Sequence, residues 1–180
     1  MRILILFFLL PLHCFSTAQD QISFIEEYID FVLDTSWFNI NGVYTFTNST
    51  HTPAQKNILF PFSIHTDSVD VVRMYHLTYG NNIDFKTLEK SILFRMEVKP
   101  LDTVSIAISY RQITKKENVY ILQSTSAWGE PLQRAKYTLT VHNPVQIRDF
   151  SYPPDSLSGN VYYWEKTKFL PGKDFIVVIK

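Results

Sequence analysis

The chain has 180 residues, of which 46% are hydrophobic and 15% aromatic, and it carries 17 basic and 17 acidic side chains. This balance leaves no basic excess to hold nucleic acid or an anionic membrane surface, so neither partner is expected. A chain of this length can bury one sizeable hydrophobic core without help from disulfides or metals.

The first 18 residues have the pattern of a secretory signal peptide. Arg2 precedes an apolar run from Ile3 to Leu12, and small residues lead to Ala18. This order predicts a signal-peptide helix, cleavage after Ala18 and a secreted, periplasmic or cell-surface protein. The run is too short to cross ~30 Å of hydrocarbon, so no permanent membrane span is expected. Cys14 is the only cysteine, so the mature chain has no disulfide and, after the loss of Arg2, carries 16 cations and 17 anions.

An alternation of apolar and polar residues dominates the rest of the chain and is typical of half-buried strands. In chain order it predicts strands at 25–33, 38–46, 58–62, 69–78, 91–98, 103–112, 119–124, 135–142, 145–150, 161–164 and 175–179. In the most regular of them, Tyr110 is expected to point inward. The best helical candidate is a single turn at 84–90, which Asp84 could cap.

Turn signals rich in Gly, Pro and Asn separate these runs. The sequence therefore predicts an all-β protein, an antiparallel β-sandwich of about ten strands with immunoglobulin-like character. No internal repeat or linker divides residues 19–180, so a single domain is expected.

Part of this order resembles the VIT domain, a β-sandwich of inter-α-trypsin inhibitor heavy chains and vault-associated proteins. The resemblance covers about residues 24–124 and rests on short motifs. These are "VYTFTN" at 43–48, "ILFPF" at 58–62, "FRMEV" at 94–98, "VSIAISYRQ" at 104–112 and "VYIL" at 119–122. The Pro-Gly-Glu turn of that family reads Pro100-Leu101-Asp102 here, without the glycine. The later stretch "AWGEPLQRAKYTLTV" resembles uncharacterised exported bacterial β-sandwich proteins. The VIT resemblance implies a non-catalytic interaction module.

The sequence offers no motif that assigns a catalytic, cofactor-binding or metal-binding residue, and no cofactor is expected. It lacks a Gly-x-Ser-x-Gly elbow and a glycine-rich phosphate loop, and its histidines are not paired at ligand spacing. The densest early acidic cluster is Glu26, Glu27 and Asp30. One strand cannot bring two carboxyl groups to the ~5–5.5 Å of a retaining glycosidase, so these acids are expected on a solvated outer face.

Three aromatic residues are candidates for a binding surface. Trp128 is expected on a loop, while Tyr162 and Trp164 share one face of a strand. Together they could stack against a sugar ring, or they could pack in the core and at its rim. Asn48-Ser49-Thr50 is either an N-glycosylation acceptor or a turn.

We therefore expect an exported, non-catalytic β-sandwich protein that acts as an interaction or structural module with an unidentified protein partner. One alternative is a carbohydrate-binding module that uses Trp128, Tyr162 and Trp164. The second alternative is a hydrolase with an unrecognised site.

Overall fold

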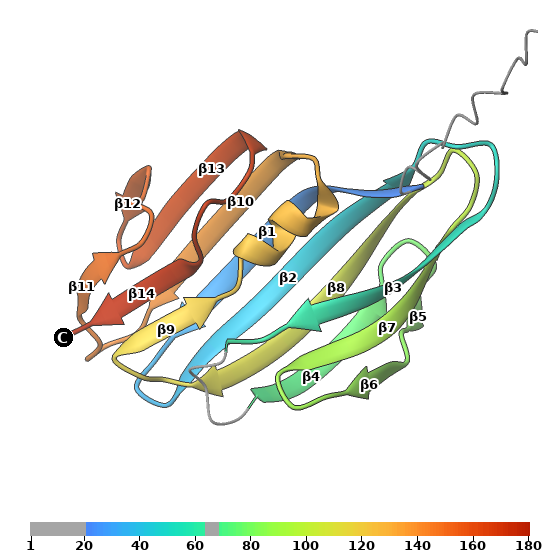
Figure 1. Cartoon of the computed structure of the whole chain (residues 1–180). Helices are drawn as coiled ribbons and strands as arrows, with labels where there is room; N and C mark the ends of the chain where they lie inside the picture. Colours follow the sequence, from blue (N-terminus) through green and yellow to red (C-terminus); the bar gives the residue numbers. More distant parts are fainter. Residues whose placement is uncertain (1–20, 64–68) are drawn as a thin grey trace, which may run out of the picture.

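A computed structural model describes residues 21–63 and 69–180 of the chain, so the expected signal peptide lies outside the described residues (Figure 1). The elements are β1 (Ile22–Leu33), β2 (Trp37–Asn48), β3 (Ala54–Pro61), β4 (Val69–His76), β5 (Asn81–Asn82), β6 (Phe85–Thr87), β7 (Ser91–Val98), β8 (Thr103–Ile113), β9 (Glu117–Tyr120), the 3₁₀ helix η1 (Gln123–Trp128), β10 (Leu132–Val141), β11 (Ile147–Phe150), β12 (Ser156–Ser158), β13 (Val161–Phe169) and β14 (Phe175–Ile179).

The described strands form one large sheet and two small ones. The large sheet has eight strands in the order β12-β13-β10-β1-β2-β8-β4-β5. The small sheets have three strands each, in the orders β11-β14-β9 and β3-β7-β6. Every strand pair within the described residues is antiparallel except β1 and β10, which run parallel at the centre of the large sheet. The predicted all-β, antiparallel sandwich is confirmed.

Both small sheets cover the same face of the large sheet (Figure 1). Phe175 of β14 stacks on Phe31 of β1, with ring centroids 4.8 Å apart. Phe60 of β3 meets Tyr44 of β2 edge-on at 5.4 Å. Phe31 pairs with Ile40, which shares the face of Tyr44 because side chains alternate along a strand. The large sheet and the two small sheets therefore enclose one core. The two small sheets form the second layer, which is divided between β9 of one sheet and β3 of the other.

Local sequence patterns account for most of these elements. Tyr110 is 2% exposed and points into the core, as predicted. The helical turn predicted at 84–90 is wrong, because Phe85–Thr87 pairs with β7 as an edge strand. In the described part of the chain, no helix combines the length and apolar character that a membrane crossing requires.

The Asn48 turn is built around a buried amide. Asn48 is fully buried, and its side-chain Nδ2 donates to the carbonyl oxygens of Thr52, Val98 and Lys99 at 2.8–3.1 Å. Its Oδ1 accepts from the backbone N–H of Thr50 at 2.9 Å. The structure therefore supports the turn interpretation, since an amide with these partners has no room for a glycan.

Candidate functional site

A pocket of about 370 Å³ lies where the second layer is divided. The large sheet forms its floor, and the lining residues there are Phe24, Glu27, Tyr44, Phe46, Ile106 and Ile108. One wall is the edge strand β3, from Lys56 to Pro61. The facing wall is formed by Tyr120, Ile121 and the η1 residues Ser124, Thr125, Ala127 and Trp128. Its volume and largely apolar lining are typical of sites for small ligands.

The single carboxyl group of the lining belongs to Glu27, which is 1% exposed. A β-bulge places it there. Phe24 pairs with Phe46 and Glu26 pairs with Thr45, so Ile25 is an extra residue in β1. The bulge shifts the alternation, and Phe24 and Glu27 both face the core although they are three residues apart. The prediction that this acidic cluster is solvated is therefore wrong for Glu27.

Tyrosine hydroxyls from three other strands surround the Glu27 carboxyl group. Tyr137 of β10 donates to Oε1, and Tyr120 of β9 donates to Oε2 at 3.3 Å. The Tyr44 hydroxyl lies 3.1 Å from that of Tyr120. Since Tyr120 donates its proton to Glu27, Tyr44 is the donor in that contact. The network joins β1, β2, β9 and β10 across both layers.

Burial dominates the electrostatics of this network. It raises the pKa of Glu27 to about 7, although the hydrogen bonds from Tyr137 and Tyr120 favour the ionised form. Burial also raises the pKa values of Tyr44, Tyr120 and Tyr137, and the nearby Glu27 charge raises them further. The tyrosines therefore stay neutral donors at physiological pH, while Glu27 changes its charge there.

Gly42 makes room for one member of the network. A Cβ atom at this position would lie 2.3 Å from the Tyr44 hydroxyl oxygen and 2.5 Å from two of its ring carbons. The Tyr44 ring thus lies over Gly42, and this position keeps the Tyr44 hydroxyl next to that of Tyr120. The sequence signal was a glycine within the strongly alternating run "FNINGVYTF".

We expect Gly42→Ala to lower the free energy of unfolding by about 2 kcal/mol, the usual cost of forcing a packed side chain out of position. Urea unfolding measures the change. The double variant Gly42→Ala/Tyr44→Ala removes the colliding ring. Gly42→Ala should therefore lower the free energy of unfolding much less in the Tyr44→Ala background than in the wild-type protein. Equal costs in the two backgrounds would show that Tyr44 is not the group displaced.

Trp128 lies at the end of η1 and forms part of the pocket wall. It is half-buried, and its ring centroid lies 5.8 Å from that of Phe24 and 5.3 Å from that of Phe46. The Nζ atom of Lys56 lies 4.3 Å from the ring centroid, a cation–π distance. Gly129 follows with φ of 80° and ends the helix. Trp128 therefore packs against the hydrophobic core and also lines the pocket.

The other two candidate aromatics belong to a different cluster. Trp164 is 2% exposed, its indole N–H donates to the Tyr152 carbonyl oxygen at 2.9 Å, and its ring meets Phe175 at 5.0 Å. Tyr162 is half-buried and packs on Phe150 at 5.0 Å. The predicted use of Trp164 as a surface-binding residue is therefore wrong, because burial with a satisfied indole leaves no face for a sugar. The structure does not bring the three rings together in one platform.

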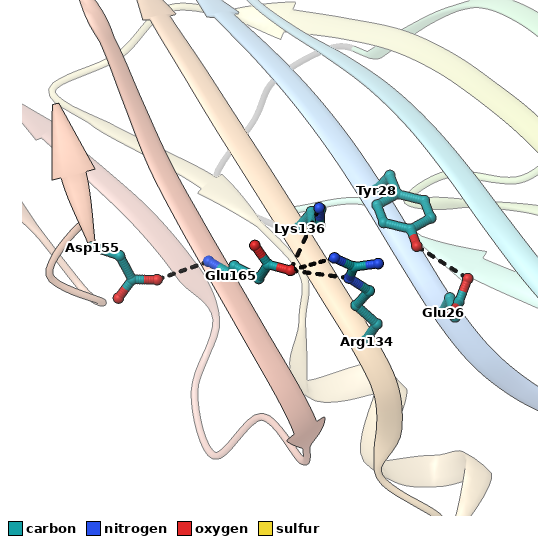
Figure 2. Close-up of polar contacts among 6 residues, drawn as sticks. All are labelled: Glu26, Tyr28, Arg134, Lys136, Asp155 and Glu165. Atoms are coloured by element: carbon teal, nitrogen blue, oxygen red, sulfur yellow. Dashed lines mark hydrogen bonds and ion pairs between the residues drawn. The ribbon is translucent and has the colours of Figure 1, made fainter. Parts of the chain in front are cut away.

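The opposite face of the large sheet carries exposed charged pairs, as Figure 2 shows. The Arg134 guanidinium donates to Oε1 of Glu165 at 2.6 and 3.0 Å, and Lys136 lies 3.4 Å from the same oxygen. The Arg134 hydrogen bond is the main cause that lowers the pKa of Glu165. Glu26 also lies on this face, in agreement with its predicted solvated position, and it accepts a hydrogen bond from the Tyr28 hydroxyl at 3.1 Å. Solvent screens such pairs, and they make no cleft.

The described residues contain no group of three or more His, Cys, Asp or Glu side chains that could hold a metal ion. Within the described lining of the pocket, Glu27 is accompanied by tyrosine hydroxyls and by Lys56. This set lacks the second carboxyl group of a glycosidase. What the pocket offers is an apolar volume with one hydrogen-bonded acid at its floor.

No protein-family model matches the sequence, and no curated protein matches it either. Solved structures do share its fold. A proposed nutrient binding protein from Legionella pneumophila aligns with a TM-score of 0.67 at 13% identity, over 89% of this chain and 67% of that one.

Leukotriene A4 hydrolase from Saccharomyces cerevisiae aligns with a TM-score of 0.55 at 13% identity, over 94% of this chain and 32% of that one. An M1 zinc metallopeptidase from Deinococcus radiodurans aligns with a TM-score of 0.51 at 10% identity, over 89% of this chain and 43% of that one. This chain thus spans less than half of either enzyme. These similarities show the fold alone, and the resemblance to the VIT domain stays a prediction.

Proposed function

We propose that this protein is an exported, non-catalytic binding module and that the central pocket is its binding site. The observation that carries the proposal is the pocket itself. An apolar cavity of about 370 Å³ lies between β3 and η1, above a buried carboxyl group. The expected signal peptide supports the exported location, and the Legionella pneumophila protein that shares the fold is described as a proposed nutrient binding protein.

The chemistry of the lining supports binding over catalysis. Seven of the 19 lining residues are aromatic, and apolar contact with such rings favours an apolar group. A protein partner could insert such a group beside β3, which is an edge strand of its sheet. The predicted protein-interaction role and the pocket are therefore compatible within one proposal.

A neutral fluorescent probe tests the proposal directly. N-phenyl-1-naphthylamine is apolar and should bind the purified protein with a saturable rise in fluorescence. Ala127→Trp places a large side chain at the pocket lining and should weaken probe binding by about tenfold. Ser126→Trp adds the same side chain one residue earlier on η1, at an exposed position outside the lining, and should leave binding within about twofold.

The comparison of the two variants decides whether the probe binds in the pocket. Equal weakening by Ala127→Trp and Ser126→Trp would place the probe elsewhere on the molecule and overturn the proposed site. An absence of saturable binding to the folded wild-type protein would overturn it as well.

A further inference from the structure

Glu27 is a buried acid for which the described residues supply no basic partner. Among residues 21–63 and 69–180, the hydrogen bonds that reach its carboxyl group come from the neutral hydroxyls of Tyr120 and Tyr137, and no ion pair includes it. A carboxyl group removed from water costs free energy unless a cation compensates for it. Within the part of the chain that the structure describes, no cation pairs with the acid at the floor of the apolar pocket.

The groups that face this acid come from every strand packed around it. They are Tyr44 of β2, Tyr110 of β8, Tyr120 of β9 and Tyr137 of β10, with Lys56 of β3 in one wall of the pocket. The four tyrosines are neutral. Lys56 is the cation in the described lining, and its Nζ atom lies over Trp128.

The carboxyl group has capacity left for a ligand. An ionised carboxylate offers about four lone-pair sites, and the two tyrosine hydroxyls occupy two of them. The floor around it includes Phe24 and Tyr44, whose ring faces attract cations. An ammonium group on an apolar body would gain both interactions in this pocket.

We propose that the pocket binds a small apolar ligand that carries an ammonium group and that the Glu27 carboxylate pairs with this group. The inference rests on the proposed function, because it names the ligand class of the same pocket. Its basis is charge complementarity: the floor supplies one negative charge, and the apolar volume above it suits a compact hydrocarbon or aromatic body.

Three indoles of similar size and different charge test the inference at pH 8, where Glu27 is ionised. Tryptamine is the cation, 3-ethylindole the neutral match and indole-3-propionate the anion. By calorimetric titration of the wild-type protein, tryptamine should bind about tenfold more tightly than 3-ethylindole, the factor of one charge-assisted hydrogen bond. Indole-3-propionate should bind more weakly than both.

Variants assign the preference to the residue. Glu27→Gln keeps a side chain that can hydrogen-bond the tyrosines but removes the charge, so tryptamine and 3-ethylindole should then bind within about twofold of each other. Glu26→Gln removes a charge from the outer face and should keep the tenfold preference. If Glu27→Gln does not fold, the wild-type protein at pH 5.5 replaces it, since protonation of Glu27 should abolish the preference while tryptamine stays charged.

The remaining outcomes distinguish a failure of this inference from a failure of the proposed function. A wild-type protein that binds tryptamine no better than 3-ethylindole, or that prefers indole-3-propionate, overturns this inference but leaves the apolar binding site intact. Persistence of the tryptamine preference in Glu27→Gln also overturns it. Failure of all three indoles and of N-phenyl-1-naphthylamine to bind would instead overturn the proposed function.

Discussion

Replacing Phe31 with alanine is expected to lower the free energy of unfolding by about 4 kcal/mol, within the range for large aromatic residues deleted from a core. Phe31 is fully buried. Its ring stacks on Phe38 at 5.2 Å and on Phe175 at 4.8 Å, and it meets Tyr120 edge-on at 5.4 Å. One ring thus joins the large sheet to the β11-β14-β9 sheet, and the cavity left by its removal cannot be filled without moving both.

Urea unfolding followed by circular dichroism measures this loss. Leu157→Ala is the matched control, because Leu157 is 56% exposed and its truncation should change stability by less than about 0.5 kcal/mol. A loss below about 1 kcal/mol for Phe31→Ala would show that this ring does not hold the two layers together.

The buried carboxyl group should make stability depend on pH in an unusual direction. The pKa of Glu27 is about 7 in the folded protein, against 4.5 for an ordinary glutamate. Between these values the folded state keeps a proton that the unfolded state has released, so stability falls as the pH rises. The contribution is fully present below about pH 4.5 and is lost as the pH passes 7, a total of about 3 kcal/mol.

Glu27→Gln removes this titration, so the variant should gain about 3 kcal/mol relative to wild type between pH 4.5 and pH 8. Unfolding by urea at several pH values measures the difference. His76 acts in the opposite direction, because burial lowers its pKa and its contribution grows as the pH rises, but it is common to both proteins and cancels. Glu26→Gln should follow the wild-type profile. Parallel profiles for Glu27→Gln and wild type would contradict the assignment.

The strands could be predicted because their faces differ in polarity. In β8, alternating Val104, Ile106, Ile108 and Tyr110 lie in the core, as the period of two requires. The three-residue strand β6 was missed because it has no pattern of its own and exists only through its pairing with β7. Trp164 shows a further limit, since the sequence alone did not settle whether Tyr162 and Trp164 pack in the core or bind a ligand.

The candidate site could not be predicted from the sequence. Alternation counted from Phe24 places Glu27 on the outer face, as predicted, because the extra residue Ile25 that turns Glu27 inward has no distinct sequence signal. The pocket itself results from the division of the second layer between β3 and β9, which lie about sixty residues apart in the chain. Only Gly42 gave a local clue, and it marks the space for Tyr44 rather than the cavity.

The parallel pairing of β1 with β10 has a consequence for how the chain reaches its native state. Phe31 lies next to Leu139, so the middle of the large sheet cannot form until a segment more than a hundred residues further along the chain has been synthesised. Contacts between such distant segments make folding slow. A chain that stops before Leu132 would carry β1 with one unpaired edge, an open template for aggregation. Transport in an unfolded form would postpone that hazard until the whole sequence is present.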